Sequence, residues 1–234
     1  MGVIPVQSCG ENKIVISLGG SVFLENGLDV EKIKDYGKAI DSIAEKYKVF
    51  VVVGGGKIAR DYINAARLLG GDETTCDKIG IEVTRINALI LALCIKKAPK
   101  IVPKSFEEAY KLSNYHRVIV MGGTFPGHTT DATAALLAEY IGAKLLLNAT
   151  AVDGIYTKDP KEHSDARKID RISPKELLEI VIQSGAKAGS SGVLDVLSVK
   201  IIERSKIKTI VFLGTPENIK KAAEGKKIGT VIEV

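Results

Sequence analysis

The sequence has few cysteines, and it has no long apolar run. Its three cysteines, Cys9, Cys76 and Cys94, are odd in number and far apart, and no C-x-x-C pair occurs. This pattern argues against a disulfide framework and favours a reducing cytoplasm. The three histidines have no metal-ligand spacing relative to these cysteines, which argues against structural zinc. No run of about 18 apolar residues occurs, so the sequence predicts no membrane span.

Aromatic residues and excess charge are also scarce. Seven tyrosines and five phenylalanines occur in 234 residues, and none interleaves with a basic cluster, which argues against a nucleic-acid groove. The net charge of +5 comes from 33 basic and 28 acidic residues, with lysines scattered beside acids. This mild excess is typical of a solvated surface, and it is equally compatible with an anionic small-molecule substrate.

The chain begins without the features of a signal peptide. Residues 1–12 have neither a basic start nor a long apolar stretch, so we expect a mobile leader there. Residues 13–234 are expected to form one domain, since this length suits one large α/β domain or two small lobes that share a sheet.

Strand and helix signals alternate along the rest of the chain. Apolar, β-branched runs predict strands over residues 13–18, 49–53, 100–102, 117–121, 144–148, 209–213 and 230–234. Helical signals predict helices over residues 29–46, 57–69, 77–97, 132–141, 195–205 and 216–223, and Ser173-Pro174 starts another. The alternation predicts an α/β fold with a mainly parallel sheet and helices on both faces.

Local signals make these boundaries more specific. Asp77 is expected to cap the long helix, and Thr130 or Asp131 to cap the next one. A D-G turn signal and a Tyr-Thr pair predict a small hairpin within residues 152–160. The apolar run at residues 88–95 has two interpretations, a central core helix or a dimer interface.

Three of the predicted strands end in glycine-rich turns, at residues 19–21 (GGS), 54–57 (GGGK) and 122–124 (GGT). The second is not a Walker loop, because Val51 replaces its first glycine and Ile58 its serine or threonine. One such turn is ordinary in an α/β protein. Three turns at one sheet edge indicate a site that holds several phosphates with backbone N–H groups.

The third turn continues as TFPGHTTD, residues 124–131, which concentrates hydroxyls and an acid before a helix. These groups suit a phosphate or a base edge, although the same residues could merely cap the helix. The segment leaves two interpretations of His128 open, a surface residue or a catalytic one.

Four segments together closely resemble the amino-acid-kinase superfamily, and within it the uridylate kinases of the archaeal type. They are ISLGGS (residues 16–21), VVVGGGKIAR (51–60), MGGTFPGHTTDA (121–132) and AVDGIYTKDP (151–160). The resemblance runs from about residue 14 to the C-terminus, with the motifs in family order.

The resemblance implies a fold and an activity. It implies a three-layer αβα sandwich whose N-terminal lobe, about residues 13–142, binds UMP, and whose C-terminal lobe, about residues 143–234, binds ATP. The implied reaction transfers the γ-phosphoryl group of ATP to UMP, in pyrimidine nucleotide biosynthesis. Mg²⁺ would be held by the phosphates rather than by protein side chains. The implied assembly is a cytoplasmic homo-oligomer, a hexamer built as a trimer of dimers.

The resemblance also assigns site residues by position. The implied UMP contacts are Gly55, Asp77, Thr124, Phe125, Pro126, Gly127, His128, Thr129 and Thr130. The implied ATP contacts are Gly20, Ser21, Gly56, Arg60, Thr150, Tyr156 and Asp159. The implied catalytic residues are Lys57, Arg60, Asp131 and Asp195.

The sequence departs from the superfamily at one position that matters for charge. Many members have lysine two residues before the first glycine pair, whereas this chain has Ser17. Another cation must then neutralise the transferred group, and Lys57 and Arg60 are the best candidates, followed by Lys187. No general base is needed, because a phosphate monoester with a second pKa of about 6 is largely ionised at neutral pH.

Two alternatives stay open on the sequence. One is a kinase of the same fold with another acceptor, such as an amino acid, carbamate or isopentenyl phosphate. The other is a non-catalytic protein that binds a nucleotide or an oxyanion, since fold alone does not determine function. The H-T-T-D segment and Asp77 favour a nucleotide acceptor.

Overall fold

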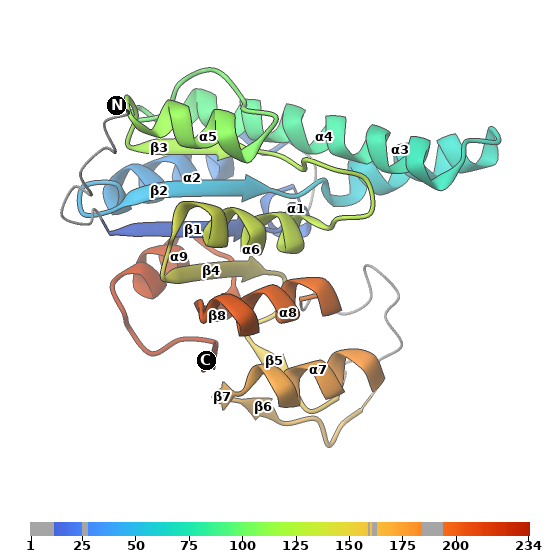
Figure 1. Ribbon diagram of the computed structural model, residues 1–234, viewed down its shortest axis with the longest axis vertical. Coiled ribbons are helices and arrows are strands. Elements are labelled where there is room, and N and C mark those ends of the chain that lie inside the picture. Colours follow the sequence, from blue (N-terminus) through green and yellow to red (C-terminus); the bar gives the residue numbers. More distant parts are fainter. Residues whose placement is uncertain (1–11, 25–27, 159, 161–162, 184–193) are drawn as a thin grey trace, which may run out of the picture.

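The computed structural model describes residues 12–24, 28–158, 160, 163–183 and 194–234. It has three layers, with a central sheet covered by helices on both faces (Figure 1). The α/β sandwich predicted from the sequence is therefore confirmed. The mobile leader expected at the start of the chain falls almost wholly on residues 1–11, which lie outside the described residues.

The central sheet has seven strands in the order β3-β2-β1-β4-β8-β9-β7. Every neighbouring pair is parallel except β8 and β9. The carboxyl ends of β1 to β4 and of β8 therefore meet at one edge, where α/β proteins bind ligands. The bounds are β1 Lys13–Leu18, β2 Lys48–Val53, β3 Val118–Met121, β4 Leu145–Thr150, β7 Arg171–Ile172, β8 Lys208–Leu213 and β9 Thr230–Ile232.

Helices cover the two faces of this sheet. One face carries α1 (Gly20–Phe23), α2 (Val30–Ile43), α4 (Glu73–Cys94) and α9 (Pro216–Ala223). The other carries α5 (Phe106–Ser113), α6 (Thr130–Ile141), α7 (Pro174–Gln183) and α8 (Val196–Ser205). Helix α3 (Gly56–Leu68) packs along α4, and the two helices project beyond the carboxyl ends of the strands (Figure 1).

Side chains along β1 alternate between the hydrophobic cores on the two faces of the sheet. Ile14, Ile16 and Leu18 join the core under α2 and α4, whereas Val15 joins the core under α6. Successive side chains of a strand point to opposite faces, so Ser17 lies on the α6 face with Val15. A buried polar residue thus takes the last α6-facing position of the strand.

The long helix begins and ends earlier than predicted. Its N-cap is Asp72, whose side chain accepts from the N–H of Thr75 at 2.9 Å, so the prediction that Asp77 caps the helix was wrong. The helix stops at Cys94 rather than at residue 97. The carboxylate of Asp41 accepts the N–H groups of Lys96 and Lys97, which holds this part of the chain outside the helix.

Two strand predictions were also wrong. Residues 100–102 form no strand, and Lys100 instead donates to the carbonyl of Ile95 at 2.7 Å, near the end of α4. Residues 152–160 do not form the expected hairpin, because the strand in this segment pairs with a strand farther along the chain. Strand β5 (Ile155–Tyr156) pairs antiparallel with β6 (Lys168–Ile169), so the D-G turn precedes the first strand instead of joining two strands.

The apolar run in α4 contributes to the core, as one of its two interpretations predicts, and a dimer interface stays a prediction. Leu91 and Ala92 are fully buried in the core, whereas Ile86, Leu89 and Leu93 are exposed on the outer side of the helix. The run therefore supplies core residues and leaves an apolar outer face. Within the residues that the structure describes, no helix has the length and apolar character that a membrane crossing needs.

Candidate active site

The glycine turns after β1 and β2 pack directly against each other. A Cβ atom at Gly20 would lie 2.1 Å from the nitrogen of Gly56, and one at Gly54 would lie 2.6 Å from the nitrogen of Gly20. Gly56 also has a φ of +66°, which L-residues with side chains rarely adopt. The glycines are thus required by the contact between the two turns, quite apart from any ligand.

The N-terminus of α3 is open toward the same edge. Its N-cap is Gly55, which offers no side-chain cap, whereas Thr129 caps α6 and Asp195 caps α8. Uncapped N–H groups and the helix dipole favour an anion at such an end. Lys57 and Arg60, in the first turns of α3, are exposed, and neither pairs with another residue in the described part of the chain. This end of α3 can therefore bind phosphate.

Helix α4 fixes two of the glycine turns from inside. The amide nitrogen of Asn87 donates to the carbonyls of Gly54 and Gly55, at 3.0 and 3.3 Å. One turn earlier in α4, the hydroxyl of Thr84 accepts from the N–H of Gly123 at 2.7 Å. Sequence reasoning missed both residues. The signal was weak but present, because Thr84 and Asn87 are polar residues three positions apart and therefore lie on one face of the helix.

A partly buried acid, Asp131, lies on the α6 side of the sheet. Oδ1 of Asp131 accepts from the hydroxyl of Ser17 and from the amide of Asn148, each at 2.8 Å. Ser17 and Asn148 are register partners on the neighbouring strands β1 and β4, so both reach the same carboxylate. One oxygen of Asp131 thus accepts from two neutral donors, and one of them is Ser17, where the resemblance led us to expect a lysine.

Burial raises the pKa of Asp131, and the nearby charge of Asp195 raises it further, while the hydrogen bonds from Ser17 and Asn148 oppose this rise.

Asp195 is linked to the start of α6, because Thr129 donates its hydroxyl to Oδ2 of Asp195. The same hydroxyl accepts the N–H of Ala132 at 3.0 Å. Thr129 is therefore the N-cap of α6, which corrects the prediction of Thr130 or Asp131.

The loop at residues 124–130 is tied to α4 by Asp77. Oδ2 of Asp77 accepts from the N–H of Gly127 at 2.7 Å, and Gly127 has a φ of +81°. The rings of Phe125 and His128 lie 5.9 Å apart across the turn that Gly127 allows. Phe125 is 66% exposed, so its face is available to a ligand. The structure thus brings Asp77 to the segment that the resemblance assigned to UMP.

The predicted ATP contacts are spread more widely. Thr150 ends β4 beside β1, at the edge that carries the glycine turns. Tyr156 lies in the separate β5–β6 pair, where Ile155 donates to the hydroxyl of Thr230 in β9 at 2.8 Å. The hydroxyl of Tyr156 donates to Asp153 at 2.9 Å, and a hydrogen bond from Lys168 lowers the pKa of Asp153. Asp159 and Lys187 lie outside the described residues.

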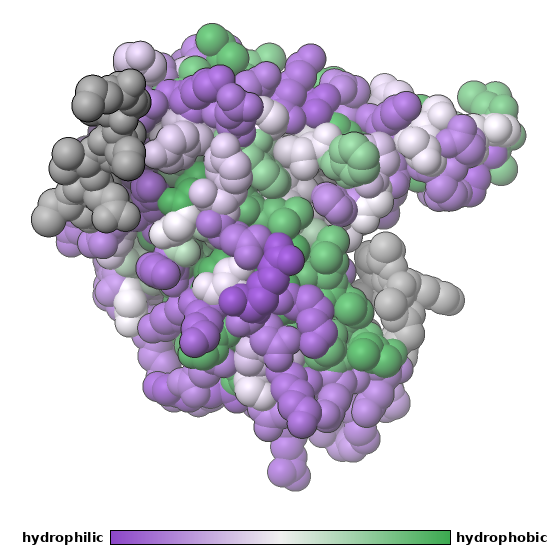
Figure 2. All heavy atoms as spheres, in the orientation of Figure 1, coloured by the Kyte–Doolittle hydropathy of each residue, from purple (hydrophilic) through white to green (hydrophobic). Residues whose placement is uncertain are grey.

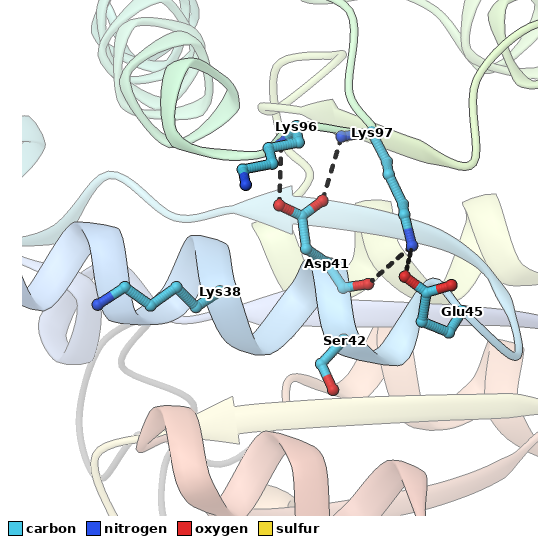
Figure 3. Close-up of a pocket in the computed structure, with 6 residues that line it drawn as sticks. All are labelled: Lys38, Asp41, Ser42, Glu45, Lys96 and Lys97. Atoms are coloured by element: carbon cyan, nitrogen blue, oxygen red, sulfur yellow. Dashed lines mark hydrogen bonds and ion pairs between the residues drawn. The ribbon is translucent and has the colours of Figure 1, made fainter.

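A pocket of about 310 Å³ lies elsewhere, beside the last turns of α2 (Figure 3). Asp41 there holds the backbone of Lys96 and Lys97, and Glu45 pairs with the side chain of Lys97. These acids and bases neutralise one another, and α2 leads to the amino end of β2, away from the glycine turns. On the site side, the outline of the molecule is indented below the projecting α3–α4 pair (Figure 2). We therefore place the chemistry at that edge.

The chain belongs to the amino acid kinase family, because the model of that family matches residues 12–213. Among its relatives, the uridylate kinase of Archaeoglobus fulgidus is 60% identical over 94% of this chain and 99% of its own length. The uridylate kinase of Methanocaldococcus jannaschii is 50% identical over 94% and 99% of the two chains. The resemblance to archaeal uridylate kinases is thus confirmed over almost the whole chain.

Solved structures agree with this assignment. The crystal structure of the Archaeoglobus fulgidus uridylate kinase has a TM-score of 0.86, with 59% identity, and the match covers 94% of this chain and 99% of that one. The UMP kinase of Bacillus anthracis has a TM-score of 0.79 at 22% identity, over 95% and 96% of the two chains. The latter identity is low, so this second match supports the fold alone.

Proposed function

We propose that this protein is a uridylate kinase, which transfers the γ-phosphoryl group of ATP to UMP and yields UDP and ADP. The observation that carries this proposal is the meeting of two packed glycine turns, the uncapped end of α3 and the loop held by Asp77 at one sheet edge. The high identity to archaeal uridylate kinases supports UMP as the acceptor. The enzyme would serve pyrimidine nucleotide biosynthesis.

The chemistry needs positioning and charge neutralisation rather than a base. The acceptor phosphate has a second pKa of about 6, so at neutral pH it attacks as an ionised oxygen. The N–H groups at the start of α3 would hold phosphoryl oxygens, and Lys57 and Arg60 would neutralise the charge that spreads over them in the transition state. Gly20 and Ser21, on the β1 turn, and Gly56 would face the ATP phosphates.

The acids at the site have a different part in this proposal. Asp131, held by Ser17 and Asn148, and Asp195, held by Thr129, would orient site groups from the starts of α6 and α8. Because Ser17 is neutral, we propose that the protein's positive charge comes mainly from α3, where Lys57 and Arg60 are exposed.

A divalent metal is implied by ATP-dependent phosphoryl transfer, and we propose Mg²⁺. No group of three or more His, Cys, Asp or Glu side chains suited to a metal occurs within the described residues. Mg²⁺ commonly binds through substrate phosphates, waters and at most one or two carboxylates, so we propose that the phosphates of the substrates hold it rather than protein side chains. When bound, the ion would neutralise charge on the phosphates.

We further propose that residues 13–142 form the UMP lobe and residues 143–234 the ATP lobe, with UMP beside Gly55, Asp77 and residues 124–130. Homo-oligomers, with a hexamer as the expected size, would cover the exposed outer face of α4 at Ile86, Leu89 and Leu93. The free thiol of buried Cys76 suits a reducing cytoplasm. Light scattering would measure the oligomer size.

A coupled assay with a panel of acceptors tests the proposal. We expect UDP formation from UMP with Mg·ATP, and much slower turnover of amino acids, carbamate and isopentenyl phosphate. Turnover of another acceptor in preference to UMP would favour the first alternative. Tight ATP binding without turnover of any acceptor would favour a non-catalytic binding protein and contradict the proposal.

A further inference from the structure

Asn87 is the polar side chain that reaches from α4 into the turn after β2. It is 3% exposed. Its amide nitrogen carries two hydrogens, and it meets two carbonyls from consecutive residues, those of Gly54 and Gly55. A buried side chain with this double contact fixes the planes of two successive peptides.

Fixing the carbonyls also fixes the N–H groups of the same peptides. In a trans peptide the C=O and the N–H point in opposite directions. The peptide that carries the Gly54 carbonyl also carries the N–H of Gly55, and the Gly55 carbonyl shares a plane with the N–H of Gly56. With both carbonyls turned toward α4, both N–H groups point away from it.

These two N–H groups have no backbone acceptor in the part of the chain that the structure describes. They stand at the uncapped start of α3, where the helix dipole adds positive potential. Beside them lies Gly20, and a side chain at that position would sit 2.1 Å from the nitrogen of Gly56. Asn87 thus holds two neighbouring N–H donors, those of Gly55 and Gly56, beside Gly20, where no side chain can be accommodated.

We propose that Asn87 is a positioning residue, which turns the N–H groups of Gly55 and Gly56 toward the phosphoryl groups of the substrates. This inference rests on the proposed kinase function for the identity of the ligand. Asn87 touches no substrate itself, and it acts through the two peptides that it holds. Without its amide, the carbonyls lose their partners and the peptide planes are free to rotate.

The test compares Asn87→Ala and the milder Asn87→Ser with the wild type. The control is Ser113→Ala, which removes another buried hydrogen bond, to the carbonyl of Tyr110 at 2.7 Å, near the end of α5 that leads to the amino end of β3. We expect Asn87→Ala to lower kcat/KM for UMP by about 10-fold to 100-fold, since misplaced donors at a developing charge are costly. Asn87→Ser should fall between Asn87→Ala and the wild type.

A second measurement separates positioning from stability. UMP should raise the Tm of the wild type and of Ser113→Ala by similar amounts, and raise the Tm of Asn87→Ala much less. Kinetic constants and UMP-dependent Tm shifts that match those of Ser113→Ala would overturn the proposal and leave Asn87 a purely structural residue. Wild-type turnover of UMP tests the kinase function separately, and with another acceptor the same variants would be compared on that acceptor.

Discussion

The two sides of the candidate site are built in different ways. On the glycine-turn side, backbone packs on backbone, and α4 holds two glycine turns through Thr84 and Asn87. On the β5–β6 side, Tyr156 is half-buried in a two-residue strand, and its hydroxyl bonds to exposed Asp153. The glycine-turn side is thus shaped by the protein interior, and the β5–β6 side by the surface. Substitutions should therefore cost most on the glycine-turn side.

The largest effect is expected for Gly20→Ala. The new methyl group would meet backbone atoms of Gly56 and Gly54 within 3 Å, and no rotamer change can relieve that contact. We expect a loss of about 3 kcal/mol or more in unfolding free energy, at the upper end for overpacking, with loss of activity. Chemical denaturation and the coupled assay measure the two effects. The control is Gly19→Ala, whose methyl group would lie 3.2 Å from the nearest atom. Equal behaviour of the two variants would contradict the close packing of the two glycine turns.

Arg60→Ala should have the next largest effect, on catalysis rather than on stability. Removing one group that neutralises transition-state charge typically lowers kcat by about 100-fold or more. Arg67→Ala is the matched control in the same helix, because Arg67 is occupied by an ion pair with Glu73 at 2.8 Å. Steady-state kinetics of both variants decides the matter, and an unchanged kcat in Arg60→Ala would remove Arg60 from this role.

Asp77→Asn should mainly raise KM for UMP, by about 10-fold, the range expected when a charged hydrogen-bond partner becomes neutral. The control is Asp72→Asn, since asparagine caps a helix as well as aspartate does. Initial rates with UMP and ATP varied separately measure both constants. An increase confined to KM for ATP would mean that the two lobes are assigned the wrong way round.

Asp131→Asn should raise Tm at neutral pH while it lowers activity. The folded protein raises the pKa of Asp131 above the value of about 3.9 in an unfolded chain, so the native state binds this proton more tightly. The wild type therefore loses stability as pH rises from about 4 through the raised pKa, and the neutral amide does not. We expect a Tm gap of a few degrees that widens with pH, since about 1 kcal/mol moves Tm by roughly 2–4 °C at this length. Calorimetry from pH 4 to 8 would show it, and a gap constant with pH would refute the explanation.

Tyr156→Phe should have the smallest effect on activity, and it tests the β5–β6 side, where we propose that Tyr156 contacts ATP. The substitution removes an exposed hydrogen bond to Asp153, and Lys168 still pairs with that carboxylate at 2.9 Å. We expect KM for ATP to change by about 2-fold or less, and Tm to stay within error, as is usual for surface changes. A change of 10-fold or more would show that the β5–β6 side is as firmly built as the glycine-turn side.

Local patterns predicted the six longer strands of the sheet and the glycine turns, because both depend on residues that are neighbours in the sequence, but they missed the two-residue strands β6 and β7. Strand β1 and the turn at residues 54–56 lie where the apolar runs and glycines place them. The start of α4 was missed because Asp72 and Asp77 both resemble caps. The hydrogen bonds decide between them. The N–H of Thr75 donates to Asp72, which makes Asp72 the cap, whereas Asp77 accepts from the N–H of Gly127, 50 residues away in the sequence.

The interior of the site was harder to predict, because its partners are distant in the sequence. Asn87 is one of several polar residues in α4, and only the packing of α4 on the glycine turns shows which carbonyls it meets. Asn148 is similar, because its role follows from the register of β4 beside β1. The resemblance pointed to Ser17 as a missing lysine. The structure shows what the serine does, which is to donate to Asp131.

The pairing of Ser17 with Asn148 also has a consequence for how the enzyme matures. The two donors to Asp131 come from strands whose sequences are separated by β2, β3 and six helices. During synthesis, β1 can pair with β4 only after the ribosome has released residue 150. An amino-terminal fragment that ends before β4 would therefore contain Ser17 and Asp131 yet lack the partner that completes their arrangement. Catalytic activity would then appear late in folding, only after β1 has paired with β4 at the centre of the sheet.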